Sequence, residues 1–223
     1  MKKPEAVIFD MDGVLIDSEP IHYKIDKEVF SQLGIQIAAD VHRTYLGMAG
    51  EFMYADLKAR FELPETVSEL LKLDELFRCE YFKRLTSLNP NEGVLNFLNE
   101  LKSGGIKLAV ATSSSPELAK ILIDRCHLTS CFDAIVTTTE AGKSKPEPDV
   151  YLLAAHKIGV MPSNCVVFED SPIGLSAAKS AGMSSIALQT KGVDVKELSE
   201  AGYLIKTFKG MTISRLYEIY SLI

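Results

Sequence analysis

Apolar residues follow two alternating patterns along this chain: short continuous runs and longer runs with helical spacing. The continuous runs lie at residues 6–10, 106–112, 132–137, 166–168, 185–188 and 203–205. A short apolar run without polar alternation is typical of a strand that is buried on both faces of a sheet. We therefore predict strands at these positions, and we expect them to be parallel.

The segments between these runs carry apolar residues at helical spacing. They predict helices at 94–101, from 115 onward, at 149–158, at 171–181 and at 213–220. Pro116 and Pro172 each stand in the first turn of a predicted helix, where proline is favoured. Strands that alternate with helices in this way predict an α/β fold with a parallel sheet covered by helices.

Residues 18–88 differ from the rest, because helical patterns follow one another there with no convincing strand. They cover 21–33, 41–46, 52–61 and 67–85, and Gly34 is placed as a helix C-cap. A turn cluster at 89–93 then marks a boundary. The predicted organisation is a core domain of residues 1–17 and 89–223, with residues 18–88 inserted as an all-helical domain.

Composition and charge narrow the classes of partner. The formal charge is −6, and no basic cluster stands out, which argues against a nucleic-acid-binding role. No run of ~18 apolar residues predicts a membrane span, and the run after Lys3 is too short for a signal peptide. The four cysteines are scattered, as in a reduced cytosolic protein. We expect a cytoplasmic monomer that binds a small molecule, without nucleic acid or membrane.

Polar residues that could take part in catalysis or ligand binding follow several of the predicted strands. In open α/β sheets, ligands bind beyond the carboxyl ends of the strands. The residues placed there or in the adjoining loops are Asp10, Thr112, Ser113, Lys145, Glu169 and Asp170. Because parallel strands share one carboxyl edge, we expect these side chains to meet in one site.

The stretch Asp10-Met11-Asp12-Gly13 suits phosphoryl transfer. Asp10 ends a buried strand, so its carboxylate has a fixed direction and could attack phosphorus to form an aspartyl phosphate. Asp12 could protonate the leaving oxygen and then deprotonate the water that hydrolyses the intermediate. The alternative is a solvated turn or a calcium loop, but the glycine position and the following apolar residues do not fit an EF-hand.

The charge of this site calls for a cation. Four carboxylates would meet there, from Asp10, Asp12, Glu169 and Asp170. A bound phosphate adds about 1.5–2 negative charges. Mg²⁺ takes oxygen ligands and commonly shares carboxylates with a substrate phosphate, so we predict Mg²⁺ as the cofactor.

Three further residues could hold the phosphate. Lys145 would oppose the charge of the phosphoryl group, and the Thr112 hydroxyl and Ser113 backbone N–H would bind its oxygens. Each has a structural alternative. Thr112 and Ser113, like Glu169 and Asp170, could cap the helix that follows, and Lys145 could be a surface lysine. Their joint placement at strand ends favours function.

The chain resembles the haloacid dehalogenase superfamily in four motifs that occur in the expected order and span nearly its whole length. The motifs are Asp10-x-Asp12-Gly13, Val110-Ala111-Thr112-Ser113, Lys145-Pro146-x-Pro148-Asp149 and Glu169-Asp170-Ser171-x-x-Gly174. The helical insertion is similar to the cap of the β-phosphoglucomutase-like branch. The resemblance implies a Rossmann-like core and a mobile cap.

The resemblance also implies roles for single residues. Asp10 would be the nucleophile and Asp12 the acid/base, while Thr112, Ser113 and Lys145 would bind phosphate. Mg²⁺ would be bound by Asp10, the Asp12 backbone carbonyl and Asp170, with Glu169 in or next to the shell. An aspartate at position 12 distinguishes the phosphatases and phosphomutases of the superfamily from its dehalogenases.

The choice between phosphatase and mutase depends on the cap. His22 falls where β-phosphoglucomutases carry a histidine, which would make it a substrate-binding residue. The mutases also use a cap arginine after a glycine turn, and here the turn at 47–51 contains none. We therefore favour a phosphatase for a small sugar or polyol phosphate, with a β-phosphoglucomutase-type mutase as the alternative. A non-catalytic module would be expected to lack a motif residue. Arg78 and Lys83 could contact substrate, but we interpret both as solvated helix charges.

Overall fold

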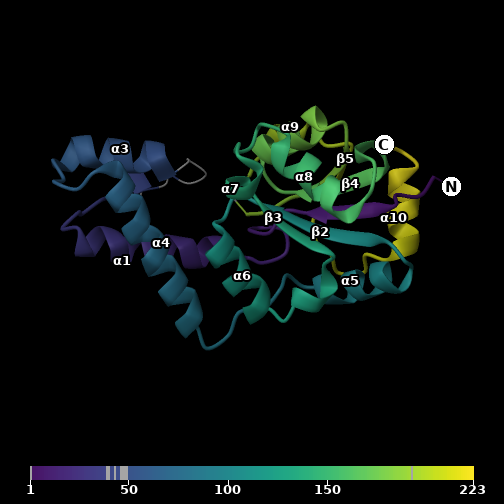
Figure 1. Ribbon diagram of the computed structural model, residues 1–223, viewed down its shortest axis with the longest axis horizontal. Coiled ribbons are helices and arrows are strands. Elements are labelled where there is room, and N and C mark those ends of the chain that lie inside the picture. The colour runs from purple at the N-terminus through teal and green to yellow at the C-terminus, as the bar shows by residue number, and fades with distance from the viewer. Residues whose placement is uncertain (1, 39–40, 43, 46–49, 192) are drawn as a thin grey trace. The chain divides into compact units, whose positions relative to one another are not determined.

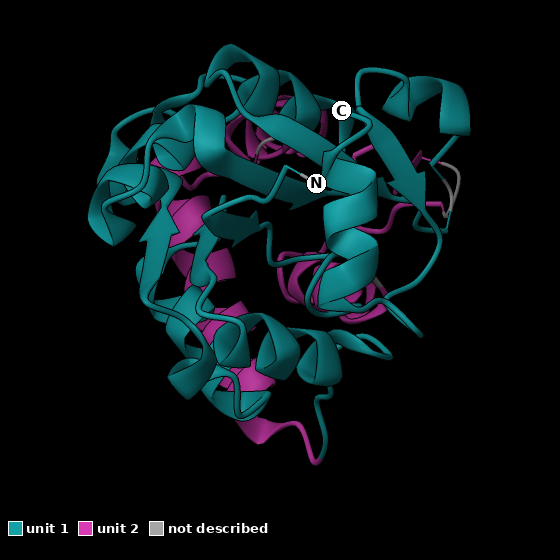
Figure 2. Ribbon diagram, turned by 90° about the vertical axis from the view of Figure 1, so that its right-hand side faces the viewer, with its two compact units in different colours: residues 1–18, 87–223 teal, residues 19–86 magenta. Residues whose placement is uncertain are grey.

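The computed structural model describes residues 2–38, 41–42, 44–45, 50–191 and 193–223 (Figure 1). The chain forms two compact units, which Figure 2 colours separately. Residues 1–18 and 87–223 form one, here called the core unit, and residues 19–86 form the other, here called the helical unit. The boundaries therefore fall after residues 18 and 86.

The core unit is built on a six-stranded parallel sheet. Its strands are β1 (Ala6–Phe9), β2 (Lys107–Thr112), β3 (Ala134–Thr137), β4 (Cys165–Glu169), β5 (Ser184–Leu188) and β6 (Tyr203–Ile205). They lie in the order β3-β2-β1-β4-β5-β6. The predicted strands are confirmed. The order changes direction at β1, which lies between β2 and β4, and such a switch point is where open sheets bind ligands.

Helices connect and cover these strands. They are α5 (Val94–Ser103), α6 (Pro116–Arg125), α7 (Thr138–Ala141), α8 (Asp149–Ile158), α9 (Pro172–Ser180) and α10 (Ile213–Tyr220), with 3₁₀ turns η1 (Thr129–Cys131), η2 (Pro162–Asn164) and η3 (Val195–Leu198). The prediction missed α7, because a helix this short shows no apolar period. It is begun by Thr137, whose hydroxyl accepts from the backbone N–H of Glu140.

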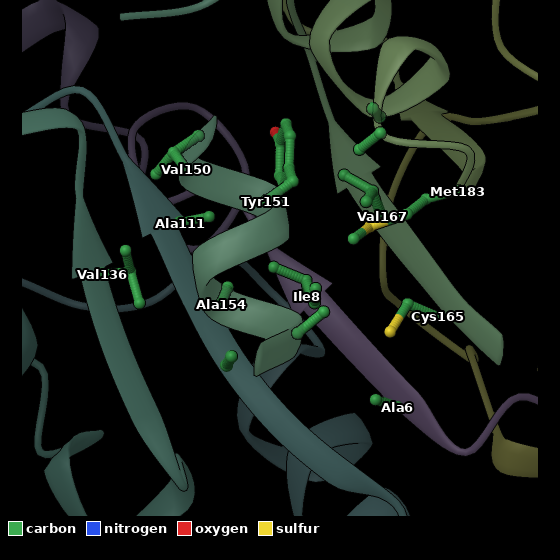
Figure 3. Packing of buried hydrophobic residues seen from close by; sticks show 14 of the residues in the cluster. Ala6, Ile8, Ala111, Val136, Val150, Tyr151, Ala154, Cys165, Val167 and Met183 are labelled. Atoms are coloured by element: carbon green, nitrogen blue, oxygen red, sulfur yellow. The ribbon is translucent and has the colours of Figure 1, made fainter. Parts of the chain in front are cut away.

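The two faces of the sheet bury different kinds of side chain. Successive strand residues point to opposite faces, so Ile8 and Phe9 belong to different layers. Ile8 packs in an aliphatic cluster with residues of α8 and α9, part of which Figure 3 shows. Phe9 lies against Phe97 of α5 and stacks on Phe168 at 5.2 Å between ring centroids. Both layers hold β1 at the centre, which fixes the direction in which the chain leaves it.

The helical unit has a small core of its own. Its helices are α1 (Glu19–Gln32), α3 (Gly50–Phe61) and α4 (Val67–Arg84), and its described residues contain no strand. One cluster of its buried apolar residues consists of Phe30, Ile35, Tyr45, Met53, Tyr54, Leu57, Leu63 and Leu70. The helices predicted at 21–33, 52–61 and 67–85 are confirmed, and Gly34 has the positive φ expected of a C-cap. The pattern at 41–46 lies partly outside the described residues.

None of the described helices, in either unit, is both long enough and apolar enough to cross a membrane.

Candidate active site

Asp10 leaves the sheet at its centre, directly after β1. Its backbone N–H donates to the carbonyl of Phe168 at 2.9 Å, and the residue is 8% exposed. Burial raises the pKa of Asp10 well above its usual value. The ammonium of Lys145 opposes this shift, and the charges of Glu169 and Asp170 add to it. The carboxylate therefore sits in a place that disfavours its negative charge until a cation compensates it.

Lys145 brings a buried positive charge to Asp10. Its Nζ donates to Asp10 Oδ1 at 2.6 Å, to Glu169 Oε1 at 2.7 Å and to the carbonyl of Ala111 at 3.2 Å. The side chain is 6% exposed, so it is no surface lysine. Burial alone would lower the pKa of Lys145, but the two carboxylates raise it well above its usual value. The group is a permanent cation.

Glu169 ends β4 as the acceptor of five hydrogen bonds. Oε1 accepts from Lys145 Nζ at 2.7 Å and from the Tyr151 hydroxyl at 2.8 Å. Oε2 accepts from the backbone N–H groups of Asp170 and Ser171 and from the Ser171 hydroxyl, at 2.9–3.0 Å. Burial would raise the pKa of Glu169, yet Lys145 and these donors lower it. Its carboxylate is charged, and both of its oxygens already accept hydrogen bonds. Glu169 is therefore better suited to orienting Lys145 than to binding a metal ion directly.

Asp170 lies against the loop that carries Asp12. A Cβ added at Gly13 would stand 2.0 Å from Asp170 Oδ2, and Gly13 has a φ of +81°. A glycine is therefore needed at position 13 both for its backbone conformation and for this close approach. At Gly174 the close approach alone requires a glycine, because a Cβ there would lie 1.7 Å from Glu169 Oε1. The two motif glycines thus leave room for the two acidic residues of β4 and its loop.

Two serine hydroxyls donate hydrogen bonds to the Asp12 carboxylate, and the sequence did not predict either contact. Ser18 Oγ donates to Oδ1 at 2.5 Å, and Ser114 Oγ donates to Oδ2 at 2.8 Å. Ser114 is in turn fixed by its backbone N–H, which donates to Thr112 Oγ1 at 3.0 Å. The carboxylate predicted as acid/base is therefore held in one orientation. Serines are too common in loops for the sequence alone to reveal such contacts.

Asn91 also shapes the site, although the sequence indicated only that it belongs to a turn. Its Nδ2 donates to the carbonyls of Gly13 and Val14, at 2.8 Å each, and its backbone N–H donates to the carbonyl of Leu15 at 2.8 Å. These bonds clamp the turn that follows Asp12. Asn91 thus ties the segment that enters the core unit at residue 87 to the segment that leaves it at residue 18.

The helix-capping alternative fails on both sides of the site. Helix α6 is capped by Ser115, whose hydroxyl accepts from the backbone N–H of Leu118, and helix α9 is capped by Ser171. Thr112 is buried at the end of β2, and Ser113 is exposed beside it. The residues predicted as phosphate ligands are therefore not used as caps.

The acidic residues of this site bear on whether it could hold a metal ion. Among the described residues, no group of three or more His, Cys, Asp and Glu side chains is arranged to hold a metal. Asp10 and Asp170 are nonetheless close enough for one charge to raise the pKa of the other carboxyl. Two carboxylates that repel each other in this way could both bind one cation, which would take its remaining oxygen ligands from the backbone and the substrate.

His22 belongs to the helical unit, where it contacts Arg78. Its Nδ1 lies 2.9 Å from Arg78 Nη1, and its ring meets Phe82 edge-on. The interpretation of Arg78 as a solvated charge is wrong. Its side chain is 14% exposed, and Nε donates to Asp74 at 2.7 Å while Nη2 pairs with Asp26. Burial among acidic partners could not be read from a helical pattern in which all these positions are polar.

Comparison with known proteins agrees with this geometry. Residues 7–188 match the family model of haloacid dehalogenase-like hydrolases. The chain is 37% identical to a phosphorylated carbohydrates phosphatase of Thermotoga maritima over 89% of this chain and 91% of that protein. It is 33% identical to a β-phosphoglucomutase of Bacillus subtilis, over 96% and 94% of the two chains.

A solved structure shows the same fold. CbbY from Rhodobacter sphaeroides, in complex with xylulose 1,5-bisphosphate, superposes with a TM-score of 0.83 at 27% identity and covers 96% of this chain and 99% of that one. The fold, the four strand-end motifs and these matches lead to one conclusion. The chain belongs to the haloacid dehalogenase-like hydrolases, in the branch that includes β-phosphoglucomutase.

Proposed function

We propose that this protein is a Mg²⁺-dependent phosphatase that hydrolyses a small phosphate monoester, such as a sugar or polyol phosphate, through an aspartyl phosphate. One observation carries the proposal. The Asp10 carboxylate stands at the centre of the sheet with the buried ammonium of Lys145 2.6 Å from it, while the Asp12 carboxylate is held nearby in sequence by two hydroxyls. This arrangement provides a nucleophile with a cation beside it and a separate residue for acid/base catalysis.

The reaction has two steps. In the first, an oxygen of Asp10 attacks phosphorus, the bond from phosphorus to the ester oxygen breaks, and Asp12 gives its proton to the departing alcohol. In the second, Asp12 takes a proton from water, which attacks the same phosphorus and releases Asp10 with inorganic phosphate. Lys145 offsets the charge of the phosphoryl oxygens throughout, with Thr112 and Ser113 as further phosphate contacts.

Asp10, Asp170 and the backbone carbonyl of Asp12 are the groups that would hold Mg²⁺. When bound, the ion would neutralise the carboxylates and the phosphate together. Glu169 would act beside the ion rather than on it, because both its oxygens are occupied by donors from Lys145, Tyr151, Asp170 and Ser171. Of the two sequence-based alternatives for Glu169, in the metal shell or next to it, the proposal takes the second.

Arg78 of the helical unit is occupied and does not provide a clamp for a second phosphate. A mutase must hold a second phosphate, and arginine is the side chain best suited to that task. All three guanidinium nitrogens of Arg78 already contact Asp74, Asp26 or His22. The Thermotoga relative, whose name gives phosphorylated carbohydrates as its substrates, supports the proposed class of substrate. His22 remains a predicted substrate contact.

The test is phosphate release from a panel of sugar and polyol phosphates. We expect Mg²⁺-dependent turnover that excess chelator stops and that Asp10→Asn abolishes. Asp194→Asn is the matched control, because Asp194 is exposed and caps η3, where asparagine serves equally well. Activity that survives in Asp10→Asn would contradict the mechanism.

The mutase alternative rests on His22 and on the similarity to β-phosphoglucomutase. A coupled assay would follow conversion of β-glucose 1-phosphate to glucose 6-phosphate after priming with the bisphosphate. We expect no conversion above the rate of hydrolysis, and sustained conversion would replace the phosphatase proposal.

A further inference from the structure

Tyr151 places one hydroxyl at the end of an otherwise apolar layer. It is the third residue of α8 and is fully buried. The other members of its cluster are alanine, valine, isoleucine, cysteine and methionine, so Tyr151 supplies the only side-chain oxygen among them. Figure 3 shows the hydroxyl turned away from the labelled aliphatic side chains. A phenylalanine would fill the same apolar space, which means that packing alone does not call for the hydroxyl.

The hydroxyl and the ring of Tyr151 each contact one half of a buried ion pair. The hydroxyl donates to Glu169 Oε1 at 2.8 Å, the same oxygen that receives Lys145 Nζ. The Lys145 ammonium also lies 4.9 Å from the centroid of the Tyr151 ring. A cation over an aromatic face is attracted to it, most strongly where water is excluded. Tyr151 therefore touches both the lysine and the carboxylate that orients it.

Lysine needs such support more than arginine would. Its ammonium is a point charge at the end of a flexible chain, with no fixed fork to define its direction. In the described part of the chain, the Lys145 ammonium is otherwise held by Glu169, the Ala111 carbonyl and the Tyr151 ring. If Glu169 Oε1 lost one of its two donors, the carboxylate could turn and take the ammonium with it.

We propose that Tyr151 is a positioning residue: its hydroxyl and ring hold the Glu169–Lys145 pair so that the Lys145 ammonium stays directed at Asp10. The inference rests on the proposed phosphatase function, and it adds to that function a residue outside the four motifs. Tyr151 does not touch the reacting atoms itself. It acts on the step in which charge on the phosphoryl oxygens is greatest, because that is where the aim of Lys145 counts most.

The first experiment compares Tyr151→Phe with Tyr220→Phe. Tyr220 is the matched control, since it is also buried but donates at 3.1 Å to the carbonyl of Ser163. We expect Tyr151→Phe to lower kcat by about three- to tenfold with little change in KM, as the loss of one hydrogen bond to a working group would do. Inhibition by aluminium fluoride with Mg²⁺, a mimic of the transferring phosphoryl group, should weaken by the same factor. Tyr220→Phe should change neither.

Tyr151→Leu removes the ring as well and should cost more than Tyr151→Phe in both measurements. A loss of thermal stability alone, with kcat and the aluminium fluoride inhibition constant of Tyr151→Phe unchanged, would show a purely structural residue and overturn the proposal.

A second readout does not depend on turnover. Competitive acetylation of amines, followed by mass spectrometry of the Lys145 peptide, reports how firmly this ammonium is held. We expect slow labelling in the wild type and in Tyr220→Phe, and faster labelling in Tyr151→Phe. If the wild type releases no phosphate but the labelling changes as expected, the proposed function fails and the positioning role stands. Equal labelling in all three proteins overturns the positioning role.

Discussion

Each unit of this protein buries one cation between two carboxylates, and the two arrangements serve different ends. In the core unit, Lys145 lies between Asp10 and Glu169. In the helical unit, Arg78 lies between Asp26 and Asp74. Both cations are at most 14% exposed. The difference lies in how the remaining bonding capacity is used.

Arg78 is a brace. Its planar fork gives one nitrogen to each of Asp74, Asp26 and His22, so it joins α1 to α4 with fixed geometry. Asp26 has a further partner in His42 at 2.9 Å. The pKa of Arg78 is raised, since its two carboxylates outweigh the effect of burial. Such a cluster holds α1 and α4 together.

Lys145 is one charge in a cluster with an acidic excess. Lys145 pairs with Asp10 and Glu169, and the pKa of Asp10 is raised well above its usual value by burial and by the charges of Glu169 and Asp170. This excess is what a divalent cation and a phosphoryl group would relieve. The comparison teaches that the same residue types form either a brace or a reactive site, depending on whether a further carboxylate, here Asp170, adds to the acidic excess around the pair.

The largest effect is expected where the brace is broken. Arg78→Met should lower the free energy of unfolding by about 3–5 kcal/mol, because Asp26 and Asp74 would be left buried without their cation. Urea unfolding followed by circular dichroism measures this loss. Arg84→Met is the control, since Arg84 is 80% exposed in its pair with Glu80, and it should change stability by less than about 0.5 kcal/mol. Equal losses in the two variants would contradict the role of Arg78.

Breaking the other pair should show in rate. Lys145→Met should lower kcat/KM by about 10²–10³-fold, the cost of removing one preorganised group that stabilises developing charge. Lys143→Met is the matched control two residues away. Lys143 is 61% exposed, and its ammonium makes only a long, exposed ion pair with Glu147, at 3.9 Å. Phosphate release under initial-rate conditions separates the two. A loss of similar size in both variants would remove Lys145 from the site.

A smaller effect is expected at Asn91, which holds the turn after Asp12. Asn91→Ala leaves the carbonyls of Gly13 and Val14 without this donor, so it should cost about 1–3 kcal/mol of stability. The turn that aims Asp12 should loosen at the same time and lower kcat. Asn89→Ala, at an exposed position nearby, should do neither. Unfolding curves and kcat for both variants provide the check, and an unchanged kcat in Asn91→Ala would count against the clamp.

The smallest effect sharpens the contrast in charge balance. Because the pKa of Asp10 is raised in the folded state, its carboxyl favours folding most when protonated, and this stability is lost as pH rises through the folded pKa. Asp10→Asn mimics the neutral group. In chelator at neutral pH it should therefore raise the melting temperature by about 2–4 °C.

The gain should vanish at a pH below the ordinary pKa of aspartic acid, where the wild-type carboxyl is protonated too. Scanning calorimetry at both pH values tests the sign. A lower melting temperature for Asp10→Asn at neutral pH would show that Asp10 contributes to stability as a charged partner of Lys145, as Arg78 does with its own carboxylates.

The sequence predicted the fold well where a physical rule links pattern to place. Apolar runs gave the strands, because a strand covered on both faces has to be apolar throughout. The rule that ligands bind at the carboxyl edge then collected Asp10, Lys145 and Glu169 before any contact was known. It could not reveal Tyr151, Asn91 or Ser114. Each of these acts through contacts with residues far along the chain, and no local pattern records such a partner.

What the sequence determined by itself was the order of strands and helices, the helical insertion and the set of strand-end residues. These follow from local periodicity and from rules of chain connection. Only the tertiary structure decided which charges are buried and which groups pair. It showed Lys145 to be buried against Asp10, Arg78 to be a brace instead of a solvated charge, and Glu169 to be fully engaged by donors. Burial and partnership of a charged group depend on what the rest of the chain brings to it, and that information is absent from any single stretch of sequence.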